Sequence, residues 1–155
     1  MIKIKKTDNA IYLEEQIKGL DFTPHRATSG SAGYDVKACI NKEIYLQPNE
    51  TYKFPTGVHI WISHRVGDPM VVGLIFPRSS TDLKLKNTIG VLDSDYQGEL
   101  FLNYKNEEDR VKTICPGDRI GQVLFTYACI DDFMIVDSFC TRTGRGTGGY
   151  GSTGR

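Results

Sequence analysis

The sequence predicts an all-β fold, and three of its features lead to this prediction. Short runs of β-branched and aromatic residues recur along the chain, and turn-forming clusters such as QPNE, VGDP, SDYQG and CPGD separate them. Only one stretch has a helical pattern, and it is short. This spacing is typical of a β-sandwich, a jelly roll or a barrel, and not of alternating strands and helices.

The individual elements follow from the same pattern. We expect strands at residues 34–40, 43–46, 58–62, 70–76, 99–105 and 121–128, and a helix at 11–19. The strand-like runs TIGVL and ELFLNY flank DSDYQG and are expected to pair as a β-hairpin, with Gly98 relieving the turn. The apolar pattern ends at Thr141. We therefore expect a single β domain over 1–140 and a flexible, glycine-rich C-terminal arm over 141–155.

Composition excludes several classes of function. Lys plus Arg and Asp plus Glu are equal at 19 each, so no global positive field favours nucleic acid or an anionic membrane as a partner. No run approaches the roughly 18 apolar residues of a membrane span. The four cysteines (Cys39, Cys115, Cys129 and Cys140) show no C-x-x-C spacing, and no apolar signal segment precedes the fold. We expect buried free thiols in a reducing compartment: the cytoplasm, or the host-cell cytoplasm for a viral protein.

The densest polar cluster, GVLDSDYQGEL at 90–100, is the first candidate site. Asp93 directly follows Val91 and Leu92, which places its carboxylate at a strand end beside apolar side chains. A carboxylate there can act as a base toward water. The alternative is that Asp93, Ser94 and Asp95 are ordinary turn formers.

The segment FPRSS at 76–80 offers a guanidinium group and two hydroxyls directly after the most apolar strand. An arginine at the end of a buried strand needs an anionic partner. That partner is either an internal carboxylate such as Asp35 or a phosphate group of a ligand, and both can hold. A turn explains Ser79 and Ser80 equally well.

In PGDRIGQVLF at 116–125, a polar Gln122 interrupts an apolar strand and must be hydrogen-bonded to protein or ligand. Asp118 and Arg119 are interpreted as a turn residue and a surface charge. The three histidines have no paired spacing with one another or with cysteine, which argues against a zinc site. No serine lies in a nucleophile elbow, so covalent catalysis has no support.

RGTGGYG at 145–151 satisfies G-x-G-x-x-G, but no helix or acidic residue follows it as a dinucleotide-binding motif requires. A frayed tail is one interpretation. The arginines at 145 and 155 and the ring of Tyr150 favour another, because glycine amides, hydroxyls and arginines bind anions and a ring covers a flat group. The arm could therefore bind a nucleotide that another part of the protein holds.

Taken in order, five segments resemble the motifs of the trimeric dUTPase family: SAGYDVKA at 31–38, FPRSS, GVLDSDYQGEL, PGDRIGQVLF and RGTGGYGSTG at 145–154. The resemblance implies a β jelly roll of the β-clip type, assembled as a homotrimer whose active sites draw residues from all three subunits. It implies hydrolysis of dUTP to dUMP and pyrophosphate, which keeps uracil out of DNA and supplies dUMP for dTMP synthesis. Mg²⁺ would bind through the triphosphate and waters.

The same resemblance implies roles for individual residues. Asp93 matches the general base that activates a water for in-line attack on the α-phosphate, and Asp35 matches an acid with a supporting role. Residues that match contacts to uracil or deoxyribose are Asn87, Gly90, Val91, Leu92 and Tyr96. Residues that match phosphate contacts in the body are Arg78, Ser79, Ser80 and Gln122. In the arm, Arg145, Ser152 and Thr153 match the triphosphate contacts, Gly151 a further substrate contact, and Tyr150 the ring over uracil.

Two other functions remain open at this point. The related dCTP deaminases share the fold but need a glutamate beside the cytosine amino group, and the one acid of the third motif that could serve is Glu99. A nucleotide-dependent binding module is a second alternative, against which an intact Asp93 and arm argue, since binding alone needs no base.

Overall fold

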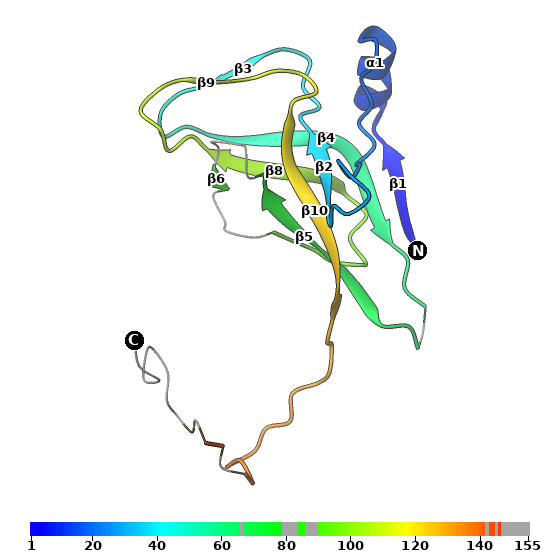
Figure 1. The fold of residues 1–155 in the computed structure, drawn as a ribbon, viewed down its shortest axis with the longest axis vertical. Helices are drawn as coiled ribbons and strands as arrows, with labels where there is room; N and C mark the ends of the chain where they lie inside the picture. Colours follow the sequence, from blue (N-terminus) through cyan, green and yellow to red (C-terminus); the bar gives the residue numbers. More distant parts are fainter. Residues whose placement is uncertain (66, 79–83, 86–89, 142, 145, 147–155) are drawn as a thin grey trace.

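The computed structural model describes residues 1–65, 67–78, 90–141, 143, 144 and 146, and the backbone of 84 and 85. Two four-stranded antiparallel sheets pack face to face, and a two-stranded ribbon lies at one end (Figure 1). The strand orders are β1-β4-β8-β6, β2-β10-β5-β7 and β3-β9. The elements are β1 Ile2–Lys6, α1 Asp8–Gln16, β2 Gly33–Lys37, β3 Ile44–Leu46, β4 Thr51–Ile62, β5 Met70–Pro77, β6 Lys84–Leu85, β7 Gly90–Leu92, β8 Glu99–Lys105, β9 Lys112–Ile114 and β10 Arg119–Ala128.

The all-β prediction is confirmed, because the inward-facing side chains of the two large sheets form the core. Val123, Leu102 and Phe54 are at most 1% exposed there, and Tyr104 donates its hydroxyl hydrogen bond to the carbonyl of Ile120. Alternate residues of β8 are buried, as a sheet with one face on the core requires. A jelly-roll sandwich therefore closes around one hydrophobic core.

The predicted hairpin around DSDYQG is wrong. β7 pairs with β5 in one sheet, whereas β8 pairs with β4 and β6 in the other. Residues 93–98 therefore cross from one sheet to the other at the rim of the sandwich. The sequence reads as a hairpin because two apolar runs flank a turn, but each run buries its apolar side chains best in a different sheet.

Several element bounds also differ from the prediction. The helix begins at Asp8 rather than residue 11, because the Thr7 side chain caps it by accepting a hydrogen bond from the Ala10 amide at 3.2 Å. β4 begins seven residues before the expected run, at Thr51, although Pro55 and Gly57 look like strand breakers. A bulge at 56–58 accommodates both residues. β1 was not expected; it forms by pairing with β4, Ile2 opposite Ile62.

The last strand ends at Ala128, and the chain then runs away from the sandwich (Figure 1). From 129 to 141 the side chains are exposed, including large apolar ones such as Phe133 at 100% and Ile135 at 97%. The predicted boundary between the β domain and the arm, at residue 140, stays a prediction. The last strand ends twelve residues before it, at Ala128.

Among the described residues, no helix is long and apolar enough to cross a membrane. All four cysteines are free thiols, but the prediction that they are buried is correct only for Cys39: Cys115 is partly exposed, and Cys129 and Cys140 are exposed. Burial raises the pKa of the Cys39 thiol. That shift makes Cys39 a poor nucleophile at neutral pH.

Candidate functional site

Asp93 lies at the rim of the sandwich, one residue beyond β7, with its side chain exposed. It borders a cavity of about 240 Å³. The other residues lining this cavity are Lys53, Ile75, Val91, Leu92, Tyr96, Glu99, Leu100 and Phe101. The carboxylate thus lies at the edge of a cavity with both apolar and charged side chains and is open to water, as a base toward water requires.

The turn after Asp93 folds Tyr96 back onto the main chain. The main-chain amide of Tyr96 donates a hydrogen bond to the Asp93 carbonyl at 3.3 Å, and the Tyr96 hydroxyl donates one to the Glu99 carbonyl at 2.9 Å. Gly98 makes this possible, because a Cβ at that position would lie 2.3 Å from the tyrosine hydroxyl oxygen. The glycine is needed for space under the ring.

β7 is the last strand in its sheet, with β5 on one side. An edge strand leaves main-chain amides and carbonyls on its outer side unpaired. Main-chain groups of β7, which spans Gly90–Leu92, that point to this outer side are therefore available to a ligand with donors and acceptors in one plane, such as a nucleobase. The side chain of Leu92 is 3% exposed and packs into the core, which fixes the edge in place.

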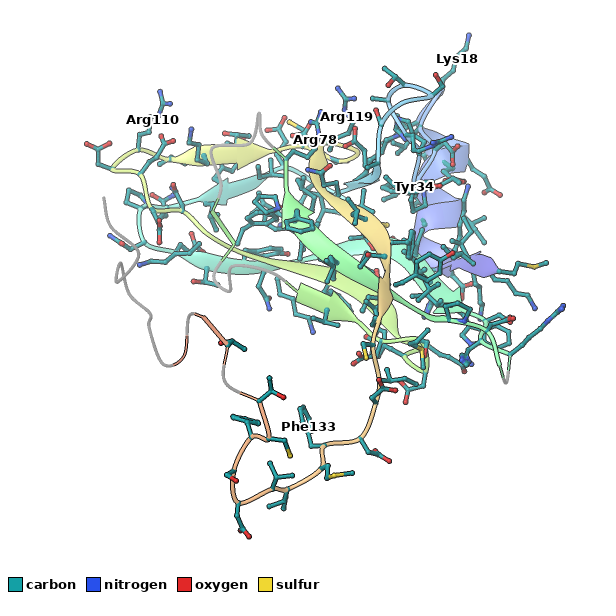
Figure 2. The ribbon with its side chains drawn as sticks, turned by 60° about the horizontal axis from the view of Figure 1, so that its bottom comes forward. Lys18, Tyr34, Arg78, Arg110, Arg119 and Phe133 are labelled. Carbon is teal, nitrogen blue, oxygen red and sulfur yellow. The ribbon has the colours of Figure 1, made fainter. Side chains whose placement is uncertain are left out.

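A second polar cluster lies at the opposite end of β5. The Asp35 carboxylate is 8% exposed and accepts from Arg78 Nε on Oδ1 at 3.1 Å and from Arg119 Nη1 on Oδ2 at 3.3 Å. The two arginines lie side by side in Figure 2. The predicted ion pair between Arg78 and Asp35 is confirmed. Arg119 is exposed, as its interpretation as a surface charge expects, but it also pairs with Asp35, which was not predicted. The side chains of Arg78 and Arg119 are 22% and 46% exposed.

We expect Asp35→Asn to lower the free energy of unfolding by about 1–3 kcal/mol, because an amide accepts from one arginine and turns its own donors toward the other. Urea denaturation followed by circular dichroism measures this. Glu108→Gln is the control: Glu108 also pairs with two cations, Arg110 and Lys112, but its carboxylate is 31% exposed against 10% for Asp35, and exposed pairs contribute about 0–1 kcal/mol. Equal unfolding midpoints for Asp35→Asn and wild type would contradict the structural role of Asp35.

Gln122 lies beside this cluster and is hydrogen-bonded, as predicted. Its Nε2 donates to the Pro77 carbonyl at 3.1 Å, directly before Arg78. Its Oε1 fills the space over Gly33, where a Cβ would lie 2.2 Å away. Gly33 in SAGYDVKA therefore gives Gln122 room to hold the end of β5.

The two clusters are far apart within one chain. β5 and β7 pair with Gly73 opposite Leu92, so Asp93 comes level with Val72. Arg78 lies six residues further along, which is about 20 Å at 3.3–3.4 Å per residue. The structure thus brings Asp93 together with Tyr96, and Asp35 with Arg78 and Gln122, but it does not bring these two groups together.

The remaining predicted contacts lie outside the described residues. They are Ser79, Ser80, Asn87, Arg145, Tyr150, Gly151, Ser152 and Thr153. Within the described part of the chain, no group of three His, Cys, Asp or Glu side chains is placed to hold a metal ion.

Sequence reasoning missed the roles of two residues. Arg119 follows a Pro-Gly-Asp turn and resembles a surface residue, and no local signal points to its partner across the sheet. Glu99 begins an otherwise apolar strand, ELFLNYK, and that placement was a usable signal. Its carboxylate accepts a hydrogen bond from the Gly57 amide of β4 at 2.9 Å.

Comparisons with known proteins agree with this architecture. The sequence model of the dUTPase family matches residues 22–154. A deoxyuridine 5'-triphosphate nucleotidohydrolase of Wigglesworthia glossinidia brevipalpis is 40% identical over 98% of this chain and 99% of its own, and that of Tolumonas auensis is 43% identical over 85% and 87%. The dUTPase of Staphylococcus bacteriophage 80alpha, solved with dUpNHpp, shares the fold, with a TM-score of 0.77 at 23% identity over 100% of this chain and 99% of its own. The chain belongs to the dUTPase family.

Proposed function

We propose that this protein hydrolyses dUTP to dUMP and pyrophosphate, with Asp93 as the base that deprotonates the attacking water. The observation that carries the proposal is the position of Asp93, exposed at the rim of a cavity and directly beside β7, which is the outer strand of its sheet among the described residues. A nucleobase bound at the edge of β7 would contact fixed main-chain groups. The Asp93 carboxylate lies where the chain leaves β7. The relatives at about 40% identity carry the name of this activity.

Recognition of uracil would use the edge of β7. Fixed amides and carbonyls discriminate strongly between bases, because cytosine presents the opposite donor pattern and leaves buried groups unpaired. Asn87 would add a side-chain contact. Tyr96, held over Gly98, would lie against the sugar and exclude a 2′-hydroxyl.

The phosphates would be bound by the second cluster and the arm. Arg78, with Ser79, Ser80 and Gln122 near it in sequence or space, would bind the triphosphate, and Arg145, Ser152 and Thr153 would close over it. Arginine forks and hydroxyls neutralise the charge that develops as a phosphoanhydride breaks. Gly151 would let the arm approach closely, and Tyr150 would stack on the base.

The residues fit a Mg²⁺ ion held mainly by the triphosphate. Both oxygens of Asp35 are engaged by arginines, so this carboxylate would act on the ion only through water. Asp93 must keep its carboxylate for the attacking water. Mg²⁺ would supply charge neutralisation on the phosphates.

We propose further that the enzyme is a homotrimer with shared sites. Asp93 and Arg78 lie about 20 Å apart along β5 in one chain, too far to act on one α-phosphate. The cavity at Asp93, about 240 Å³, is also smaller than the roughly 300–1,000 Å³ of most ligand pockets. A second copy that brings its Arg78 to this rim would complete the pocket.

The exposed apolar segment supports association between copies. Phe133, Met134 and Ile135 are each at least 85% exposed, which a chain acting alone rarely tolerates. The outer strands β1 and β2 of the two sheets border an apolar groove of about 280 Å³ that contains Ile2, Ile4 and Phe125. We propose that residues 130–139 of a neighbouring copy pack against this surface and carry the arm, 141–155, to another subunit's site.

The four free thiols support a cytoplasmic location.

The direct test is a pyrophosphate-release assay on dUTP, dCTP, dTTP and UTP, with and without Mg²⁺. We expect release from dUTP to exceed release from the other nucleotides by about 10⁴ in kcat/KM at best, because the site reads hydrogen-bond patterns. Addition of a chelator is expected to abolish most turnover. Ammonia release from dCTP, or equal rates on all four nucleotides, would overturn the proposal.

A further inference from the structure

A bulge in β4 lies next to the 93–98 turn, which begins at Asp93. The pairing of β4 with β8 shifts register between Pro55 and His59, so that residues 56–58 oppose a single residue of β8. Gly57 has φ 73°, and a Cβ there would lie 2.7 Å from Cys39 Sγ and 2.8 Å from Ala10 Cβ. Position 57 therefore requires glycine both for its backbone conformation and for its space.

Three polar groups of the bulge have partners outside the pairing of β4 with β8. The Gly57 carbonyl accepts from the Thr7 amide at 2.9 Å, and the buried Thr56 hydroxyl donates to the Leu100 carbonyl at 2.7 Å. The Gly57 amide, which has lost its place in the ladder, donates to Glu99 Oε1 at 2.9 Å. The carboxylate of Glu99 thus replaces a main-chain acceptor and joins β4 to the first residue of β8.

From Glu99 the contacts continue to Asp93. The carbonyl of Glu99 accepts the Tyr96 hydroxyl at 2.9 Å, and the Tyr96 amide donates to the Asp93 carbonyl at 3.3 Å. On the same side, His59 Nδ1 lies 3.0 Å from the Gln97 carbonyl. A series of hydrogen bonds therefore runs from the rigid bulge through Glu99 and Tyr96 to the residue that holds the base.

We propose that Glu99, held by the bulged Gly57, is a positioning residue that fixes the 93–98 turn and sets the place of Asp93 and Tyr96. The inference rests on the proposed role of Asp93. Because residues 93–98 cross between two sheets and β7 and β8 are not paired with each other, strand pairing alone does not hold the turn. The same contact gives Oε1 of Glu99 a structural role as a hydrogen-bond acceptor.

Glu99→Ala removes the acceptor, whereas Glu99→Gln keeps an oxygen that the Gly57 amide can reach. We expect Glu99→Ala to lower kcat on dUTP about tenfold or more, because a misplacement of about 1 Å at a reacting group can cost about 10²-fold. Glu99→Gln is expected to restore kcat to within about threefold of wild type, since it loses only the charge on the hydrogen bond. Glu15→Ala, exposed on α1, is the control.

Combining Glu99→Ala with Asp93→Asn separates positioning from general stability. If Glu99 acts through Asp93, its loss has little further effect on kcat once the base is absent. Full additivity of the two losses would overturn the proposal. So would wild-type kcat in Glu99→Ala, or a Glu99→Gln variant as slow as Glu99→Ala.

Hydrogen–deuterium exchange gives a readout that does not depend on activity. Exchange over residues 90–101 is expected to rise in Glu99→Ala and not in Glu99→Gln, with α1 unchanged in both. If the wild-type protein released no pyrophosphate from dUTP, the proposed function would fail while this comparison still tested the contact. Should Glu99→Ala not fold, Glu99→Asp, whose shorter side chain withdraws the acceptor, takes its place in both measurements.

Discussion

Asp93→Asn is expected to lower kcat on dUTP by about 10² to 10⁴ while leaving the fold intact. The amide cannot take the proton from the attacking water, but it has the same shape as the carboxylate. Asp93 is exposed, and its main-chain carbonyl, which accepts from Tyr96, is unchanged in the variant. KM is therefore expected to change little. Steady-state pyrophosphate release, with circular dichroism to check folding, measures both effects.

Asp95→Asn is the matched control for this variant. Asp95 lies in the same turn, is also exposed and also loses one negative charge. Its kcat is expected to stay within about twofold of wild type, because surface charges away from the reacting atoms are nearly neutral. Equal activity of Asp93→Asn and wild type would show that another group activates the water.

Removal of residues 141–155 is expected to leave a folded oligomer whose kcat is lower by about 10² or more, since a single lost contact to developing charge has that effect. The segment has no apolar pattern to contribute to a core, and it holds the predicted contacts to phosphate and base. Pyrophosphate release and size-exclusion chromatography test the two parts of the prediction. Full activity in the truncated protein would contradict the role of the arm.

A longer truncation, from residue 129, separates the arm from association. It removes the exposed apolar segment as well, including Phe133 and Ile135, and is expected to weaken the oligomer. The shorter truncation keeps that segment and is its control. If both truncated proteins eluted at the size of the full chain, residues 130–139 would not hold the subunits together.

Mixed oligomers test whether the sites are shared. Asp93→Asn and the 141–155 truncation are each expected to be nearly inactive alone, but subunits exchanged at equal amounts would give about a quarter of sites an intact base from one chain and an intact arm from another. Recovery of activity supports arms that act in another subunit. No recovery after verified exchange would place the arm on its own chain.

The fold class was predictable because alternation along a strand is a local property. ELFLNYK was predicted at its observed bounds, 99–105, since every second residue of it faces the core. β4 was predicted too short, because Pro55 and Gly57 end a strand in most contexts and only the bulge against β8 accommodates them. β1 was not predicted, since its alternating Ile and Lys residues form a strand through pairing with β4.

Some contacts of the candidate site could also be predicted from the sequence, and others could not. The ion pair between Arg78 and Asp35 could be predicted, since an arginine after a buried strand needs an anion. The ion pair of Arg119 could not be predicted, because its partner Asp35 lies 84 positions away in sequence. The hydrogen bond of Glu99 to Gly57 depends on a bulge that no local pattern marks.

The sequence by itself determined the all-β fold class, the family and the residues that can carry the chemistry, because strand and turn patterns and the order of the motifs are local properties of the chain. The tertiary structure decided where those residues meet. It showed that 93–98 joins two sheets instead of closing a hairpin, and that Asp93 and Arg78 lie at opposite ends of β5. Strand pairing and bulges depend on contacts between segments distant in sequence, and these contacts set which side chains share a site.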